Sequence, residues 1–370
     1  MTKLQRAIKQ LSFSCAETFD QLLDSKIPSV FTTHAAHRAY NILPLLPGSE
    51  FTTEIQERHF ESPDVPKLGL GVIPNALISG SSFIGTETDV WQMPEMMPAY
   101  VDKRLATHHS EQIAFPINAE EIYVSGLSVL LTHWNTALYG HWLLEGMPKL
   151  LLLRTLGLQE LQIIIPESSP NFIGEWINMI LPEAKLIKYN QDREFVRCER
   201  VLLPTMLCSR RYFYHRRLSK MIDDTWSSTM TRTHGKNRLY VSRDKPSPRR
   251  VLTNKIEIEG IAAENGFTII IPEHLPVADQ ISLFQNTDVI VGDYGSAMHN
   301  TIFSPRGSVV LCLNWLGQLQ GRVAHLREQH VGYLLPRGGQ PVRLVEGQTI
   351  PSPYSIEPVR FARLIRQIAG

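Results

Sequence analysis

The sequence predicts an α/β protein in which parallel strands alternate with helices. Short runs of β-branched residues alternate with helical patterns between residues 238 and 314, and again between residues 128 and 204. Strands and helices that alternate at this spacing are typical of parallel β-α-β units. The chain has 370 residues, which is long for one domain, so we expect two.

The first predicted domain spans residues 1–232 and opens with a β-rich lead-in over residues 1–120. Short β-like runs occur there, separated by Pro and Gly, at FTTEIQERHF, LGLGVI and ALISGSSFIG. Runs bounded by such turn-forming residues indicate strands. The remainder, residues 121–232, is expected to be α/β.

A regular pattern of elements supports this α/β part. A strand at SVLLTH (128–133) is followed by a helical pattern at YGHWLLEGMPKLLLLRTLG (139–157). The following runs predict a strand, a helix and two further strands at LQIIIP, NFIGEWINMIL, KLIKY and ERVLLP. The polar stretch THGKN (233–237) is the expected linker between the two domains.

The second predicted domain spans residues 233–335. Its first strand, RLYV, runs into Ser242-Arg243 and then into a loop rich in Pro and Arg. A helical pattern follows, with Asn254 and Glu257 at the spacing of an N-cap and its reciprocal acid. Gly266 occupies the position of a helix C′ residue.

The alternation of strands and helices continues to residue 313, with strands predicted at FTIII, DVIV and SVVLCL and a helix at VADQISLFQN. A glycine-bearing turn, GDYGSAMHN, leads into another helix. Ligands of parallel sheets lie beyond the carboxyl ends of the strands, so we expect the loops after Arg243, Ile271 and Gly292 to meet at a site. Residues 336–370 are predicted to be a polar tail that ends in a helix.

Composition and charge narrow the class of protein. Hydrophobic residues make up 43% and charged residues 20%, as in an ordinary soluble globular protein. The four cysteines have no paired spacing, so neither a disulfide framework nor a zinc site is predicted. The first 20 residues lack the apolar core of a signal peptide. We therefore expect a cytoplasmic protein, with room for a peripheral contact at the inner face of a membrane.

The net charge of +1 hides a basic segment. Residues 205–250 contain twelve Lys or Arg and three Asp, a local excess of nine positive charges. Such a segment attracts phosphate groups of a nucleotide, a lipid or a nucleic acid. Part of it, residues 210–220, is equally well explained as a solvated helix face.

Three tracts in this order resemble glycosyltransferase family 61. They are YGHWLLEGMPKLLLL, the stretch RLYVSRD with its following RR and N, and the stretch from GFTIII to GSVV. The resemblance covers roughly residues 120–315. It implies a GT-B architecture, in which two Rossmann-like domains face each other across a cleft, with residues 233–335 as the donor domain. Two departures are Tyr294-Gly295-Ser296, where the family more often has His-Gly-Ala or His-Gly-Ser, and Thr253-Asn254, where it more often has Asn-Glu.

The resemblance also implies an activity. It is inverting transfer of a sugar from a nucleotide sugar to a glycan or lipid-linked glycan, with no required cofactor and no obligatory metal. Bacterial members of the family suggest a role in surface or capsular polysaccharide assembly. No nucleic-acid partner is expected.

The chemistry of such a transfer requires a stabilised pyrophosphate leaving group, held by a metal or by cations and helix N-termini. The sequence contains no Asp-x-Asp pattern for a metal. Arg243 offers a charge-assisted fork at a strand end, and the amides around Gly295 are expected to point at a phosphate. Glu273 is either a ribose ligand or a loop acid, and Asn300 either binds the donor or packs against a loop. The predicted donor-binding residues are Arg243, Arg249, Arg250, Asn254, Glu273, Gly295, Ser296, Ala297 and Asn300.

Inversion also needs a base for the acceptor hydroxyl. His141 and Glu145 lie four residues apart and therefore on one helix face. They are either a base with its orienting acid or a structural hydrogen-bonded pair, and Glu145 could itself be the base. Asp293, in the glycine turn, is the third candidate.

Two other functions are compatible with parts of the sequence. An NAD(P)-dependent oxidoreductase on a Rossmann sheet is disfavoured because no G-x-G-x-x-G lies between a strand and a helix. A non-catalytic binder of polyanions or nucleic acid would use residues 205–250. Against it, these basic residues do not form a recognisable binding module.

Overall fold

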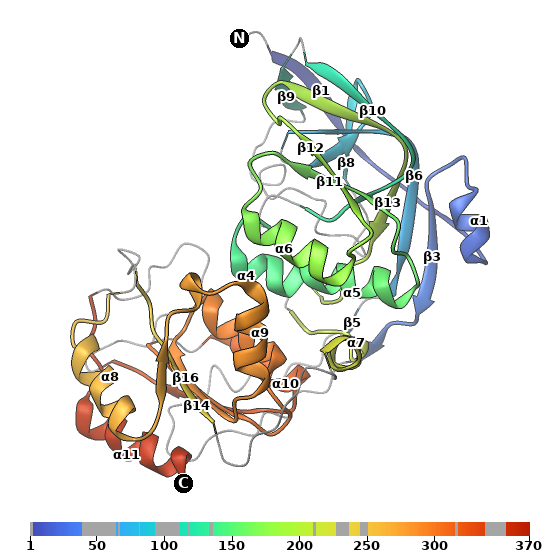
Figure 1. Ribbon diagram of the computed structural model, residues 1–370. Helices are drawn as coiled ribbons and strands as arrows, with labels where there is room; N and C mark the ends of the chain where they lie inside the picture. Colours follow the sequence, from blue (N-terminus) through green and yellow to red (C-terminus); the bar gives the residue numbers. More distant parts are fainter. Residues whose placement is uncertain are drawn as a thin grey trace. The chain divides into compact units, whose positions relative to one another are not determined.

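The computed structural model describes residues 3–38, 64–65, 67–80, 82–92, 112–116, 119–132, 136–209, 212–226, 237–244, 251–314, 317–336 and 353–370. These residues divide into two compact units, with the boundary between Met221 and Ile222 (Figure 1). Both units contain sheets and helices, which confirms the α/β prediction. The GT-B arrangement of the two units stays a prediction.

The first unit is organised on one mixed sheet, whose described strands pair in the order β12-β11-β10-β13-β6-β7-β8-β1-β9, with β3 also on β6 and β2 on β3. The strands are β1 (Lys3–Gln10), β2 (Ser14–Cys15), β3 (Ser29–His34), β6 (Leu68–Ser79), β7 (Phe83–Gly85), β8 (Asp89–Gln92), β9 (Gln112–Pro116), β10 (Glu120–Leu130), β11 (Gln162–Pro166), β12 (Lys185–Tyr189) and β13 (Glu194–Pro204). Short strands β4 (His37–Arg38) and β5 (Asp64–Val65) pair separately. Strands β12, β11, β10 and β13 are parallel, whereas β6 runs antiparallel to β13.

The long pairing of β6 with β13 joins the two predicted parts of the first domain. It extends from Ser79 opposite Phe195 to Leu70 opposite Pro204, so the β-rich lead-in and the α/β part form one continuous sheet. The first unit therefore differs from a purely parallel Rossmann-like domain. Ten of the twelve residues of β6 are buried, as in a central strand covered on both faces. The predicted strand at 51–60 and most of the predicted linker at 233–237 lie outside the described residues.

The predicted helix at 139–157 is present, but its middle is a π-helix. Helix α4 (Tyr139–His141) continues into η2 (Trp142–Gly146) and α5 (Met147–Thr155). Pro148 lacks a backbone N–H and therefore cannot form the regular bond to Leu144, which favours a local change of register. π-Bulges of this kind occur frequently at functional sites.

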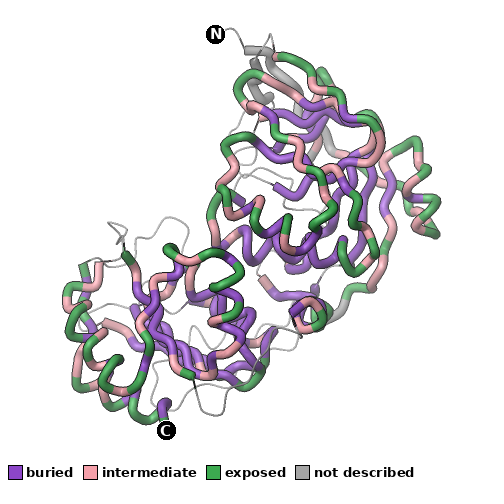
Figure 2. The backbone as a smooth tube through the Cα atoms, in the orientation of Figure 1, coloured by how far each residue is buried: buried purple, intermediate pink, exposed green. Residues whose placement is uncertain are grey.

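Further helices cover this sheet or follow it. They are α1 (Phe19–Leu23) and α6 (Asn171–Ile180), while α7 (Arg217–Trp226) contains the boundary between the two units. Helix α5 packs against α6 and β13 (Figure 1). Figure 2 shows the buried backbone concentrated along the central strands and α5, where seven consecutive residues, 147–153, are buried. No helix in the described ranges is long and apolar enough to cross a bilayer.

The second unit contains a parallel sheet in the order β15-β14-β16-β17-β18. Its strands are β14 (Arg238–Val241), β15 (Thr268–Ile270), β16 (Val289–Asp293), β17 (Val309–Leu313) and β18 (His330–Leu334). Its helices are α8 (Lys255–Glu264), η4 (Pro272–His274), α9 (Val277–Gln285), η5 (Ser296–Phe303), α10 (Gln318–Leu326) and α11 (Pro358–Ala369). The predicted β-α-β pattern is thus confirmed here. Because the strand order reverses between β14 and β16, the crevice at their carboxyl ends is the expected ligand position.

Helix α8 begins and ends where the sequence predicts, but the predicted N-cap hydrogen bond is absent. Gly266 has φ of +80°, as a C′ glycine requires. Asn254 is at the N-cap position, yet its side chain makes no capping hydrogen bond. Its amide instead exchanges bonds with Ile356, donating to the carbonyl at 2.8 Å and accepting from the N–H at 3.1 Å. A partner distant in sequence has therefore replaced the local cap.

The C-terminal helix α11 is an integral part of the second unit. Phe361 and Ile365 are fully buried in a core that also contains Tyr240 and Ile258. The rings of Tyr240 and Phe361 meet edge to face, with centroids 6.4 Å apart. Residues 353–370 thus complete the packing around β14.

Replacing Phe361 with alanine should destabilise the second unit by about 3–5 kcal/mol, because the large ring would leave a cavity beside Tyr240. Urea unfolding followed by circular dichroism would measure this loss. Val359→Ala on the same helix is the control, since Val359 is 76% exposed and its removal should change stability by less than about 0.5 kcal/mol. Equal effects of the two substitutions would contradict the role of α11 in the core.

Candidate active site

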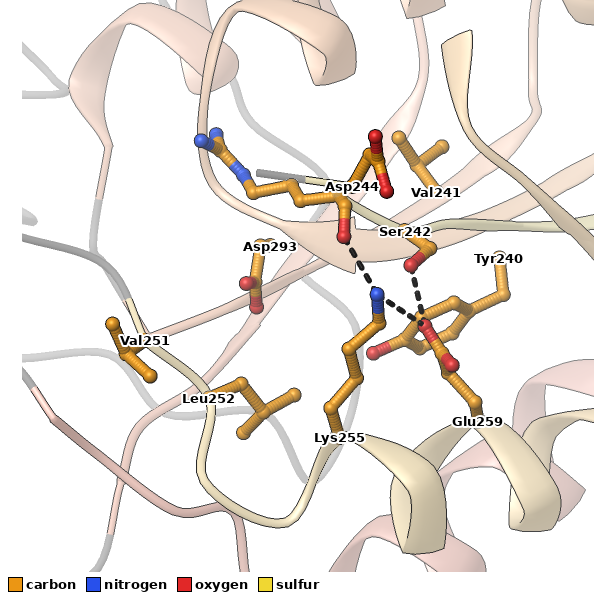
Figure 3. Close-up of a pocket in the computed structure, with 10 residues that line it drawn as sticks. Tyr240, Val241, Ser242, Asp244, Val251, Leu252, Lys255, Glu259 and Asp293 are labelled. Carbon is orange, nitrogen blue, oxygen red and sulfur yellow. Dashed lines mark hydrogen bonds and ion pairs between the residues drawn. The ribbon is translucent and has the colours of Figure 1, made fainter. Parts of the chain in front are cut away.

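A cavity of about 150 Å³ opens at the carboxyl ends of β14 and β16, the point where the strand order reverses (Figure 3). Its lining combines aliphatic and polar side chains. The lining residues are Tyr240, Val241, Ser242, Arg243, Asp244, Val251, Leu252, Lys255, Glu259 and Asp293. The structure therefore contains a cavity at the place where strand order predicts a ligand.

Arg243 connects the two loops that flank this cavity. It follows β14, and its Nη2 donates to the carbonyl of Tyr294, after β16, at 3.2 Å. The loops after Arg243 and Gly292 therefore meet, as expected from the sequence. The remaining N–H groups of a guanidinium form a rigid fork suited to phosphate oxygens.

The turn after β16 leads into a 3₁₀-helix, η5. Gly295, at the N-cap of this helix, has φ of 166°, an extended conformation open to any residue. Gly292 is the constrained glycine, because a Cβ there would lie 2.6 Å from the carbonyl oxygen of Val241. Ser296 is exposed and Ala297 half-buried, and the amides of a first helical turn have no partner within the helix.

A polar cluster from α8 forms one wall of the cavity (Figure 3). The ammonium of Lys255 donates to the carbonyl of Arg243 at 2.6 Å and lies 3.7 Å from the carboxylate of Glu259. The hydroxyl of Ser242 also donates to Glu259. Sequence reasoning did not include Lys255 and Glu259, although their i,i+4 spacing at the start of α8 was a signal that one face of this helix carries charge.

Asp293 is held by a residue from the far end of the chain. The hydroxyl of Tyr354 donates to Oδ1 of Asp293, and Tyr354 is 5% exposed. Burial, followed by the charge of Asp293 and this hydrogen bond, raises the pKa of Tyr354 far above its usual value, so the phenol stays a donor. Residues 336–370, which the sequence predicts to be a polar tail, contain no spacing pattern that points to Tyr354.

The other predicted donor-binding residues that the structure describes are not among the residues that line the cavity. Asn254 contacts Ile356, and Glu273 is exposed in η4. Asn300 is fully buried and donates to Gln280 at 2.9 Å, as in the packing alternative. Two further predicted residues, Arg249 and Arg250, lie outside the described residues. Within the described ranges, no three His, Cys, Asp or Glu side chains gather as a potential metal site.

In the first unit, His141 and Glu145 form the predicted pair. Nδ1 of His141 lies 3.0 Å from Oε1 of Glu145, and the side chains are 30% and 6% exposed. A third residue joins them, because the hydroxyl of Tyr212 donates to the same carboxylate oxygen at 2.6 Å. The pair is therefore a half-buried imidazole in front of a buried, hydrogen-bonded carboxylate.

Behind the pair lies a fully buried lysine. Lys149, one turn after Glu145, donates to the carbonyl of Leu131 at 3.2 Å. Burial lowers the pKa of Lys149 to about 8, although the negative charge of Glu145 acts to raise it. Burial also raises the pKa of the nearby Cys208 thiol, which therefore remains neutral. Glu145 and Lys149 are thus opposite charges in a region shielded from water, where each stabilises the other.

The second unit is of the doubly wound α/β class, with its cavity at the switch point. Residues 139–311 match the family model described as Glycosyltransferase 61, a region that runs from α4 into β17. This region is a glycosyltransferase family 61 domain, which confirms the resemblance and makes the chain a glycosyltransferase. No protein with a curated description matches the chain significantly.

Proposed function

We propose that this glycosyltransferase takes its sugar from a nucleotide-sugar donor bound at the switch point of the second unit. The observation that supports this most directly is the bond from Arg243 to Tyr294, which holds a cation between the cavity and the N-terminus of η5. Arginine forks and helix N-termini both bind phosphate oxygens. A pyrophosphate here would contact Arg243 and the amides of Ser296 and Ala297, with the nucleoside directed toward the cavity.

The acceptor hydroxyl must lose a proton during transfer, and we propose His141 as the base because of its own surroundings in the first unit. Its Nδ1 faces Glu145, which leaves Nε2 for a substrate, and its ring is partly exposed. Glu145 is buried and already accepts from Tyr212, so it fits the role of orienting acid. Asp293 remains the alternative base, since it lines the donor cavity.

The finer features of the activity follow from the family resemblance. We propose inversion at the anomeric carbon, a GT-B arrangement, and stabilisation of the leaving group without an obligatory metal. The proposed acceptor is a glycan or lipid-linked glycan of bacterial surface or capsular polysaccharide. The proposed location is the cytoplasm, with contact at the inner face of the membrane.

A nucleotide screen tests the donor class. The full chain would be titrated with UDP, GDP, CMP, dTDP, ADP and NAD, with and without EDTA, and followed by ligand-detected NMR and thermal shift. We expect selective binding of one nucleoside diphosphate or CMP, unchanged by EDTA. Binding of NAD alone would support an oxidoreductase instead. Binding of none would contradict the proposed donor site.

A further inference from the structure

Tyr212 is held in place by strained backbone. It has φ of +60°, in the left-handed region that costs free energy for a residue other than glycine. Its N–H donates to the carbonyl of Ser209 at 2.9 Å, and the N–H of Ser209 donates to the carbonyl of Phe213 at 3.0 Å. Cys208 and Tyr214 form a β-bridge just outside these bonds. The local turn therefore fixes the direction in which the Tyr212 ring leaves the backbone.

That direction brings the phenol to the His141–Glu145 pair. The Tyr212 hydroxyl is 2.6 Å from Oε1 of Glu145 and 3.4 Å from Nδ1 of His141. One carboxylate oxygen thus receives two groups, the phenol and the imidazole. A carboxylate with two donors is restricted in rotation, and so is the ring that it holds.

The contact with Glu145 determines which imidazole nitrogen can react. A carboxylate only accepts, so a neutral His141 must carry its proton on Nδ1 to satisfy Glu145. Nε2 then carries the free lone pair. A base needs this tautomer, because the nitrogen that faces the substrate must be unprotonated.

We propose that Tyr212 is a positioning residue that fixes Glu145 and thereby holds His141 as the Nδ1–H tautomer with Nε2 available as the base. The role of His141 as base rests on the proposed function, whereas the tautomer is a property of the protein alone. Lys149 assists, since its ammonium favours the ionised form of Glu145 in the buried region. Glu145 and Tyr212 face Nδ1 of His141, and Lys149 and Cys208 lie near Glu145.

Nitrogen-15 NMR of the full chain labelled at histidine tests this directly. The two ring nitrogens of His141 would be assigned from the signals that disappear in His141→Gln. At a pH where this ring is neutral, the wild-type protein should show a single tautomer protonated at Nδ1. Tyr212→Phe should give a mixture of tautomers, while the same change at Tyr123, which is 61% exposed in β10, should leave the spectrum unchanged.

Turnover and donor affinity, measured separately, provide a second test. A residue that only supports the fold would not lower turnover while leaving donor affinity unchanged. With a sugar donor that carries the nucleotide selected by the screen, Tyr212→Phe should lower turnover about tenfold, as expected for loss of a hydrogen bond to a charged group, while donor affinity stays within about twofold. Glu145→Gln replaces the carboxylate that both Tyr212 and His141 contact, and it should also give mixed tautomers. It serves as the second variant if Tyr212→Phe does not fold.

The outcomes separate the two proposals. A single Nδ1–H tautomer retained in Tyr212→Phe, or in Glu145→Gln if Tyr212→Phe does not fold, would overturn the positioning role of Tyr212. A wild-type ring protonated at Nε2 would overturn it as well. Failure of every nucleotide to bind would contradict the proposed donor site, yet the NMR result would still decide the role of Tyr212.

Discussion

Arg243→Ala is expected to weaken the binding of the nucleotide donor by about 10- to 100-fold, the loss of a charge-assisted hydrogen bond of about 1.5–3 kcal/mol. Arg243 lines the cavity and donates to the turn after β16, so its guanidinium lies between the two loops of the proposed donor site. Lys255, a second cation in the cavity lining, is already bonded to the carbonyl of Arg243 and paired with Glu259. Among the described residues that line the cavity, the missing charge would therefore stay uncompensated.

Isothermal titration with the nucleotide selected by the screen would measure this loss. Arg243→Lys should restore only part of the affinity, because an ammonium keeps the charge but lacks the planar fork. Arg363→Ala, an exposed arginine on α11, is the matched control and should bind like the wild type. If Arg243→Ala and Arg363→Ala bound the nucleotide equally well, the donor would have to lie elsewhere.

The second unit was largely predictable because its local signals and its tertiary structure agree. Each predicted strand from 238 to 313 is present, since short β-branched runs between helices have few alternatives to a buried parallel strand. Strand order was not predictable from periodicity. Strand order depends on which strands pair with each other. The pairing of β14 with β16 places the switch point between these two strands.

The first unit was harder to predict because its sheet depends on long-range pairing. β6 and β13 are separated by more than a hundred residues, and nothing in either run specifies an antiparallel partner. The hydrophobic pattern of β6 indicates a buried strand but not its sheet. The π-helix was missed for a related reason, since a regular helix and a π-bulge share most of their apolar pattern.

The site residues found only in the structure share one property. Tyr212 and Tyr354 each reach their carboxylate from a segment distant in sequence, 67 residues from Glu145 and 61 from Asp293. Spacing rules detect pairs on one helix, such as His141 with Glu145, because helical geometry brings them together. A tyrosine in a loop has no such signal, so its role became visible only once the fold had placed its hydroxyl.

His141→Gln should lower turnover by about a hundredfold or more while donor affinity is preserved, because general-base catalysis contributes factors of this size and the base does not hold the nucleotide. The substitution keeps a polar side chain of similar length near Glu145, so folding should be retained. Rates of nucleotide release from the donor, measured beside affinities from titration, would separate the two effects. A rise in the Michaelis constant alone would indicate loss of substrate binding.

One control and one further variant are needed to distinguish the candidate bases. His330→Gln changes an exposed histidine at the start of β18 and should leave turnover unaltered. Asp293→Asn lies in the donor cavity, where it would leave the Tyr354 hydroxyl facing an uncharged amide, so we expect it to change donor affinity as well as turnover. If Asp293→Asn instead abolished turnover at unchanged affinity while His141→Gln remained active, Asp293 would be the base. The His141–Glu145–Tyr212 group would then be a structural network within the first unit, since its geometry would not affect the transfer step.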